Sequence, residues 1–276
     1  MNGTDHHGTC ARAVGRALLF LETVSSRDLT FEEKESPRDL VSGADIAVHN
    51  LISQELEPSG IPVLSEENVE SHSGQASGAG LRWLLDPIDG TTNYAARIPL
   101  YGVSLGLMRG KAFVAGAFGM PATRELFYTA SDDASYLNDA RLRPAPSALA
   151  ASLVAACFSS RTGGAAGARE AEFRAFGLIN DRSRGCVRLG SAATSICYAA
   201  AGKVGASYGI NCKLWDVAAA LAVARAANCK VLTTTASAPL ALSFVVGHGD
   251  VVGEIQSILQ GELGINEWTQ VSHHGA

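Results

Sequence analysis

The sequence predicts a protein of two halves, an N-terminal α+β domain built on an antiparallel sheet (residues 1–143) and a C-terminal α/β domain (residues 144–276). Three observations lead to this fold class. Two stretches with helical apolar spacing come first, short β-rich runs joined by tight turns follow, and strands alternate with helices beyond Pro144 and Pro146. Consecutive strands joined by tight turns form antiparallel sheets, whereas alternation of strands and helices is typical of α/β folds.

The N-terminal half begins with two predicted amphipathic helices. Residues 13–21 and 48–56 carry apolar side chains at helical spacing, and they flank a polar loop or hairpin at 25–43. Predicted strands follow at 62–65, 81–86, 102–108, 112–118 and 125–129, with turns at 109–111 and 120–122.

In the C-terminal half, the sequence predicts strands that alternate with helices. Its strands are expected at 152–157, 186–189 and 204–208, and its helices at 168–179, 192–201 and 217–227. The stretch 214–232 is apolar almost all round, but Asp216 and Arg225 interrupt it. It is therefore predicted as a buried core helix and not as a membrane span.

Composition excludes several classes of protein. Hydrophobic residues make up 47% and charged residues 18% of the 276 residues, and the formal net charge is −5, so neither bulk disorder nor a basic nucleic-acid surface is expected. Without a membrane-length apolar run or a secretory signal, we expect a cytoplasmic protein with no nucleic-acid or membrane partner. The six cysteines form no CxxC pair. His6, His7, His273 and His274 lie near the ends, where we expect disorder and no chemistry.

The most informative stretch is residues 83–93, an apolar strand that runs into two acids. Pro87 is expected to turn the chain, which brings Asp89 back toward Asp86 and leaves the carbonyl of Ile88 without a ladder partner. Two close carboxylates repel one another unless a cation lies between them, and an all-oxygen ligand set suits Mg²⁺ or Mn²⁺. The stretch therefore predicts half of a hard-metal site, and a plain type I turn with an aspartate cap is the alternative.

Small polar residues directly follow these acids. Gly90, Thr91 and Thr92 can open a helix whose free N–H groups receive a phosphate beside the metal. An EF-hand is excluded, because Pro87 and the three-residue spacing of the acids do not fit its ligand pattern.

Other acids are weaker candidates when taken one at a time. Glu66 follows a predicted strand and is either a further metal ligand or part of a solvated acidic loop. Asp216 precedes an Ala-rich helix. Its simplest interpretation is an acid at the helix N-terminus, where the helix dipole favours a negative charge. Asp39 and Asp45 stand before a helix, where Asp45 is a candidate first-turn acid.

Together, these elements resemble the inositol monophosphatase family of Mg²⁺-dependent, lithium-sensitive phosphatases, over residues 34 to about 232. Residues 83–94 fit the family's aspartate signature without a mismatch, and residues 215–219 match the start of its second signature. The family's other elements are matched by Glu66-Glu67, residues 39–45 and residues 189–193. The resemblance implies a layered α-β-α-β-α sandwich of the inositol monophosphatase and fructose-1,6-bisphosphatase type, and a homodimer.

The resemblance also implies a role for each site residue. Two or three Mg²⁺ ions per site, with Mn²⁺ as a substitute, would be held by Glu66, Asp86, the Ile88 carbonyl, Asp89 and Asp216. The catalytic residues it implies are Asp45, Glu66 and Thr91, of which Asp45 and Thr91 would orient the attacking water. The phosphate and the alcohol would contact Asp89, Gly90, Thr91, Ser191, Ala192, Ala193 and Asp216.

Some positions depart from the family pattern. Gly209 stands where inositol-hydrolysing members usually carry a glutamate, so a carboxylate that accepts polyol hydrogen bonds is missing; Asn211 and Lys213 are candidates to shape that wall. Ser65 replaces a usual glycine, which requires a negative φ there. Asn228 stands where a small residue, usually glycine, ends the second signature, and asparagine tolerates the left-handed conformation.

We therefore expect a Mg²⁺-dependent phosphomonoesterase that uses metal-activated water on a small phosphorylated polyol, with myo-inositol 1-phosphate as the first candidate. Gly209 leaves histidinol phosphate, a sugar phosphate or bisphosphate, and 3′-phosphoadenosine 5′-phosphate open. A regulatory, partner-binding protein on the same fold is the alternative from another class, although the complete set of acids argues against a purely non-catalytic role.

Overall fold

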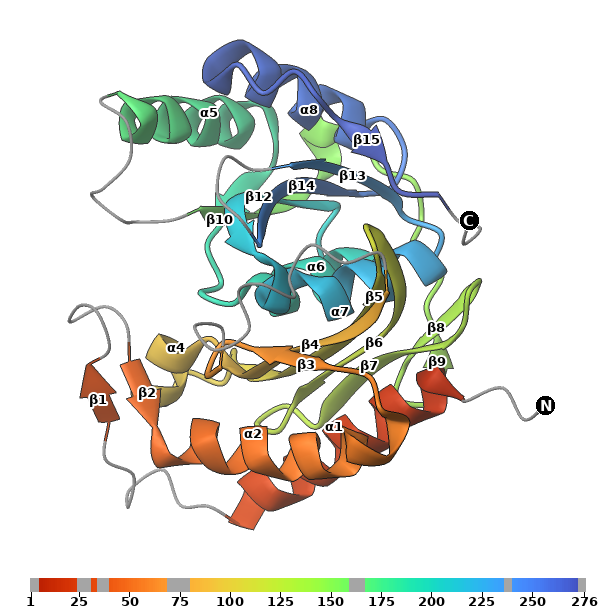
Figure 1. Cartoon of the computed structure of the whole chain (residues 1–276). Coiled ribbons are helices and arrows are strands. Elements are labelled where there is room, and N and C mark those ends of the chain that lie inside the picture. The colour runs from red at the N-terminus through yellow and green to blue at the C-terminus, as the bar shows by residue number, and fades with distance from the viewer. Residues whose placement is uncertain are drawn as a thin grey trace.

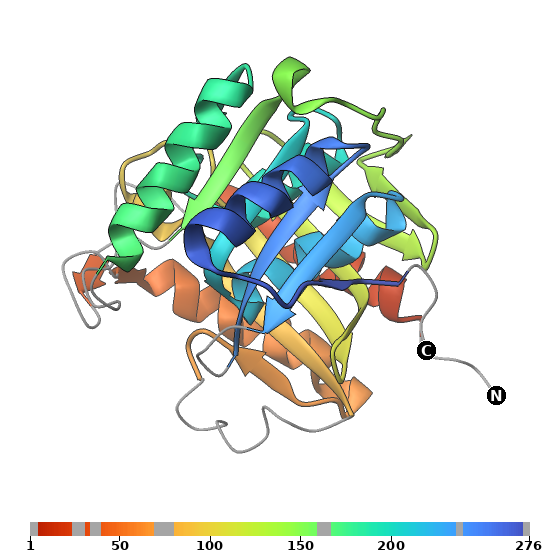
Figure 2. The ribbon, with the colours of Figure 1, turned by 90° about the horizontal axis from the view of Figure 1, so that it is seen from above.

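The structure is a computed structural model, and it describes residues 5–23, 31–33, 40–68, 80–158, 167–235 and 240–272. Its elements stack in five layers (Figure 1): helices α1 and α2, a seven-stranded sheet, helices α6 and α7, a six-stranded sheet, and helices α5 and α8. The view from above shows the outer helices α5 and α8 lying across the second sheet (Figure 2). The layered α-β-α-β-α sandwich expected from the sequence is confirmed.

The first layer contains the two predicted N-terminal helices. Helix α1 (His6–Thr23) and helix α2 (Gly43–Leu56) are separated by the antiparallel strands β1 (Phe31–Glu33) and β2 (Leu40–Ser42), and the short 3-10 helix η1 (Glu57–Ser59) follows. The predicted hairpin is therefore present in the described residues, while Asp39 lies outside them.

The expectation of disorder at the N-terminal histidines is wrong. His6 and His7 form the first turn of α1, where the ring of His6 lies 6.0 Å edge-on from Trp83 and His7 Nδ1 lies 2.8 Å from Thr129 Oγ1. Contacts with the sheet below order this turn, and a local sequence pattern does not show them. His273 and His274 lie outside the described residues.

The seven-stranded sheet has the order β3-β4-β5-β6-β7-β8-β9. Its strands are β3 (Val63–Ser65), β4 (Leu81–Asp89), β5 (Gly102–Arg109), β6 (Ala112–Met120), β7 (Glu125–Ser131), β8 (Ala134–Leu137) and β9 (Ala140–Arg141), and the short helix α4 (Thr91–Ala95) follows β4. All neighbours are antiparallel except β3 and β4, which are parallel. The five predicted strands are confirmed, and β8 and β9 are additional.

The predicted turn at Pro87 is wrong, because β4 continues through it to Asp89. Asp86 pairs with Ser104 and Asp89 with Gly102. Between these two pairs, β4 therefore has one residue more than β5, which is a β-bulge. This bulge absorbs one residue where proline cannot donate a ladder hydrogen bond. In a regular strand, residues three apart face opposite sides, whereas the bulge puts Asp86 and Asp89 on the same side.

The C-terminal half forms the middle helices, the second sheet and the last helical layer. Its elements are the 3-10 helix η3 (Leu149–Ala151), β10 (Leu153–Phe158), α5 (Ala168–Arg182), β11 (Gly185–Val187), α6 (Ala192–Ala200), β12 (Ala206–Lys213), α7 (Leu214–Ala226), β13 (Lys230–Thr235), β14 (Ala241–Gly247), α8 (Val251–Leu263) and β15 (Thr269–Gln270). The sheet has the order β11-β10-β12-β14-β13-β15, and only the pairs that β10 forms with β11 and β12 are parallel.

The predicted core helix is shorter than its apolar stretch. Helix α7 ends at Ala226, and residues 230–232 already belong to β13. The sequence patterns predict no element beyond residue 232, yet β14 and α8 lie there. All seven residues of β14 are buried, so no alternation marks it as a strand.

Helix α7 lies in the middle layer against both sheets, and two glycines of the first sheet let it approach closely. A Cβ on Gly106 would lie 2.7 Å from the nitrogen of Ala219, and one on Gly116 would lie 2.4 Å from its carbonyl oxygen. One hydrophobic core joins side chains of both halves around α7, so the division at residue 143 stays a prediction. None of the helices in the described ranges is long and apolar enough to cross a membrane.

Candidate active site

The predicted acids come from four elements and meet near the end of β4. Asp86 and Asp89 lie at the end of β4, Glu66 directly after β3, Asp45 in the first turn of α2 and Asp216 in the first turn of α7. Asp86 feels the charges of the other four carboxylates, which shows that they lie near one another. The structure therefore brings together the acids that the sequence singled out.

The end of β4 is fixed by its own side chains. Asp86 Oδ1 accepts a hydrogen bond from the Ile88 N–H at 3.1 Å, and the hydroxyl of Thr91 donates to the Ile88 carbonyl at 3.0 Å. Asp86 is 3% and Asp89 6% exposed. Gly90, with φ +91°, then starts α4, so the N–H groups of its first turn face the end of the strand.

The turn that carries Glu66 is fixed at both ends. Asn68 Oδ1 accepts the Ser65 N–H at 2.8 Å, the Ser65 hydroxyl accepts the Glu67 N–H at 3.3 Å, and the Glu66 N–H donates to the Leu85 carbonyl at 3.2 Å. Ser65 is not among the residues with positive φ, as its replacement of glycine requires. Asn228 adopts φ +65°, which confirms the left-handed end predicted for α7.

The start of α6 lies against Asp89. Asp89 Oδ2 accepts hydrogen bonds from the Ser191 hydroxyl and from the Ala193 N–H, the latter at 2.9 Å. Ser191 also caps the helix, since its hydroxyl accepts the Thr194 N–H at 3.0 Å. A segment predicted to contact the alcohol part of a substrate therefore orients an acid predicted to bind metal.

Buried negative charge raises the pKa values of these acids. The pKa of Asp86 lies well above its ordinary value, first because of burial and then because of the charges of Glu66 and Asp89. The pKa of Asp216 is raised well above its ordinary value by burial and by Asp89, and the nearby Lys213 offsets part of this effect. Burial also raises the pKa of Asp89 to about 6, against the lowering effect of its hydrogen bonds to Ser191 and Ala193.

This donor set fits a hard divalent cation. Several carboxylates share one buried region and disfavour one another's charge, so a cation would relieve their repulsion, and carboxylate and carbonyl oxygens suit Mg²⁺ or Mn²⁺. Within the described residues, no three acidic, histidine or cysteine side chains already surround one point as metal ligands would.

Position 209 has no room for a side chain. A Cβ on Gly209 would lie 2.2 Å from Phe244 Cε1 and 2.7 Å from Cys212 Sγ. The pKa of the Cys212 thiol is raised first by burial, and Asp216 and Asp89 contribute, so this wall borders the acid cluster. At this point an aromatic ring and a thiol replace the carboxylate usual in the resembled family. Nearby, Asn211 adopts φ +55° and donates its N–H to Ser243 Oγ at 3.1 Å.

The sequence patterns gave Asn93 no role, but this residue ties the site together. Its side-chain amide donates to the carbonyls of Leu100 and Leu189, both at 2.7 Å, and so links α4 to the segment before α6. A Cβ on Gly190 would lie 2.7 Å from that amide nitrogen. The feature of the sequence that could have pointed to Asn93 is its place as the last polar residue of the run that begins at Asp86.

Comparisons with known proteins agree with this geometry. The model of the inositol monophosphatase family matches residues 7–267. A Mesorhizobium japonicum protein named inositol-1-monophosphatase is 36% identical over 70% of this chain and 72% of its own length. Mycobacterium tuberculosis inositol-1-monophosphatase SuhB is 32% identical over 89% of this chain and 87% of its own.

Other comparisons add a relative named for a different role and a solved structure with the same fold. A Pasteurella multocida protein named Nus factor SuhB is 29% identical over 70% of this chain and 72% of its own. The structure of Mycobacterium tuberculosis SuhB superposes with a TM-score of 0.75 and 25% identity, and the match covers 94% of this chain and 97% of that one.

Proposed function

This chain belongs to the inositol monophosphatase family and is a phosphoric monoester hydrolase, and we propose that it hydrolyses a small phosphorylated polyol with Mg²⁺, myo-inositol 1-phosphate being the first candidate. The observation that supports this most directly is the buried carboxylate cluster beside the first turn of α4. Cations held by the acids and N–H groups of that turn would together offset the charge of a phosphate.

We assign the metal ligands as the resemblance implies. The oxygens of Glu66, Asp86, Asp89, Asp216 and the Ile88 carbonyl would hold two or three Mg²⁺ ions, or Mn²⁺ in their place. Bound there, the ions would neutralise phosphate oxygens and lower the pKa of the attacking water. The protein would also orient the substrate and the attacking water, and this needs no covalent step.

Thr91 and Asp45 would orient the water. The hydroxyl of Thr91 donates a hydrogen bond to the Ile88 carbonyl at 3.0 Å. The lone pairs of the hydroxyl oxygen can therefore accept a hydrogen bond from water. A threonine hydroxyl is too weak a base to take the proton by itself, so Thr91 positions the water. The backbone N–H groups of Gly90 and Thr91 at the start of α4 would receive the phosphate.

The alcohol part of the substrate would lie against Asp89, Asp216 and the start of α6. Ser191 and Ala193 hold one oxygen of Asp89 and so set the direction of its carboxylate; Ala192 lies between them. The wall formed by Gly209, Phe244 and Cys212 offers no carboxylate to a hydroxyl group. This difference keeps histidinol phosphate, sugar phosphates or bisphosphates and 3′-phosphoadenosine 5′-phosphate as alternatives.

The test is phosphate release from a panel of these esters, with Mg²⁺ and with EDTA, compared by kcat/KM. We expect one preferred ester, hydrolysed only when Mg²⁺ is present. Equal turnover in EDTA would contradict the proposed metal dependence, and preference for an ester outside the polyol phosphates would contradict the proposed substrate class.

A regulatory role is the second candidate, because two relatives are named Nus factor SuhB. Such a protein would act through a partner surface on the same fold. It is favoured if no ester of the panel is turned over although Mg²⁺ raises the Tm of the protein. We also propose a cytoplasmic location, as the sequence patterns predict, and a homodimer on the resemblance alone; a light-scattering mass equal to one chain would contradict the dimer.

A further inference from the structure

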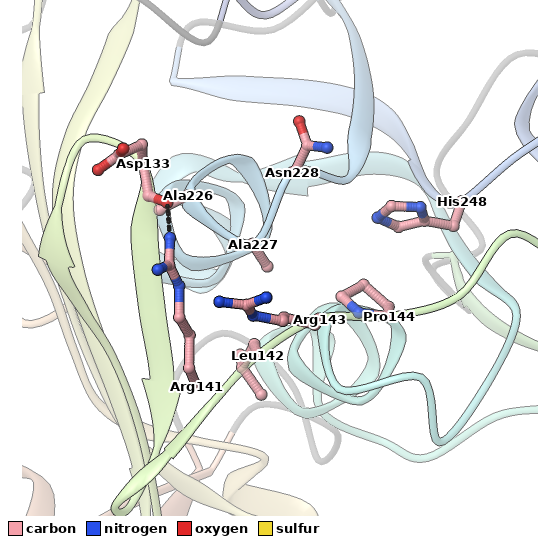
Figure 3. A pocket seen from close by; sticks show the side chains of 9 residues that line it. All are labelled: Asp133, Arg141, Leu142, Arg143, Pro144, Ala226, Ala227, Asn228 and His248. Atoms are coloured by element: carbon pink, nitrogen blue, oxygen red, sulfur yellow. Dashed lines mark hydrogen bonds between the residues drawn. The ribbon is translucent and has the colours of Figure 1, made fainter.

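A cavity lies at the C-terminal end of α7 (Figure 3), whereas Asp216 of the acid cluster lies at the N-terminal end of this helix. It has a volume of about 230 Å³. Its walls come from segments far apart in the sequence: residues 141–144 at and after β9, residues 226–228 at the end of α7, His248 after β14, and Asp133 before β8. Asp216 stands ten residues before Ala226, so the two sites are separated by about 15 Å of helix.

Two arginines line this cavity. The side chains of Arg141 and Arg143 are both exposed (Figure 3), while Leu142, between them in the sequence, is 7% exposed and anchors the segment. Arg141 donates to the main-chain carbonyl of Asp133 at 3.0 Å. Among the described residues, neither arginine forms an ion pair with a carboxylate.

Asp133 is the acidic residue among those that line the cavity. The carboxylate of Asp133 accepts the Ser131 hydroxyl at 2.7 Å and points away from the cavity in Figure 3. The C-terminal end of α7 contributes only about half a negative charge. Both guanidinium groups carry a positive charge at the wall of one cavity, so an anion bound there would be attracted by both.

His248 provides a further polar group at the opposite wall. Burial lowers the pKa of its ring, and the neighbouring main chain of Ala227 and Asn228 raises it, so the ring already faces two main-chain groups. Its Nε2 is buried and forms no hydrogen bond of normal geometry with the described residues, so it can also contact a bound molecule. The apolar part of the wall is supplied by Leu142, Pro144, Ala226 and Ala227.

We propose that this cavity is a second ligand site, which binds a small metabolite through a phosphate or carboxylate group held by Arg141 and Arg143. A guanidinium fork matches two oxygens of such a group, and two guanidinium groups on one cavity match a molecule with more than one negative charge. The volume is well above that of a water molecule and somewhat below the usual range of ligand pockets, so it suits a small anion. The site is independent of the proposed reaction.

The test is calorimetric titration of the full chain with pyrophosphate and, separately, with citrate, in EDTA at constant ionic strength. Without divalent cations the carboxylate cluster of the first site repels both anions, so binding reports the second cavity. We expect binding of at least one probe, and the preferred probe shows whether phosphate or carboxylate is the recognised group. R141Q/R143Q should weaken it about a hundredfold, roughly tenfold for each guanidinium.

The matched control is R124Q/R182Q, which removes the same charge from two exposed arginines elsewhere on the surface. Binding by this control should stay within about twofold of the parent protein, and urea unfolding curves should show that both variants are folded. The proposal is overturned if neither probe binds the parent protein, if R141Q/R143Q binds as tightly as the parent, or if the control loses binding equally.

Discussion

Replacing Asp89 by asparagine is expected to stabilise the metal-free protein while it abolishes turnover. Asp89 is 6% exposed and stands among the other carboxylates at the end of β4. Its Oδ2 accepts hydrogen bonds from Ser191 and Ala193, which the amide oxygen of asparagine can also accept. Asp89→Asn therefore removes a buried charge and keeps the hydrogen bonds around it.

The size of the effect follows from the pKa of Asp89. Burial raises this pKa from 3.8 to about 6. Because the folded value lies above the unfolded one, the stabilisation by the bound proton is fully present below about pH 4 and is lost as the pH rises through 6. A gap of about two pH units corresponds to roughly 3 kcal/mol at pH 8, and the asparagine variant avoids this loss.

The measurement is urea unfolding in EDTA at pH 4 and pH 8, followed by the fluorescence of the buried Trp83 and Trp215. The free energy of unfolding of Asp89→Asn should exceed that of the parent by up to about 3 kcal/mol at pH 8 and by little at pH 4. Asp139→Asn, at an exposed turn, is the control and should change neither value. A gain that is absent at pH 8, or equal at both pH values, would refute the reasoning.

Three further outcomes are expected. Thr91→Val should lower kcat about a hundredfold while Thr91→Ser retains most of it, because the hydroxyl orients the water; an equal loss in both variants, measured by steady-state kinetics, would contradict this role. Gly209→Ala should cost about 1–3 kcal/mol of unfolding free energy, since its Cβ would lie 2.2 Å from the ring of Phe244. The control Gly177→Ala, in open space on α5, should not destabilise in the same urea assay. Finally, LiCl should inhibit Mg²⁺-dependent turnover more strongly than equal KCl, because a small monovalent ion can occupy a loosely held metal position; equal inhibition would count against it.

Local patterns predicted the elements that depend on local physics. The three consecutive strands β5, β6 and β7 were predictable because tight turns separate short β-rich runs. The prediction of a turn at Pro87 was wrong because the missing N–H of proline is compatible with a bulge as well as with a turn. Only the pairing register with β5 decides between the two. Strand β14 was missed because burial on both faces removes the alternation that marks a strand.

The sequence by itself determined the chemistry of the candidate site: which oxygen ligands are present, the small polar residues that begin α4, and the absence of a carboxylate at position 209. Only the tertiary structure decided how these groups meet. Gly106 and Gly116 let α7 approach the first sheet and bring Asp216 toward β4, Phe244 fills the space beside Gly209, and distant segments enclose the cavity at Arg141 and Arg143. These are contacts between residues far apart in the chain, and periodicity and spacing report only neighbours.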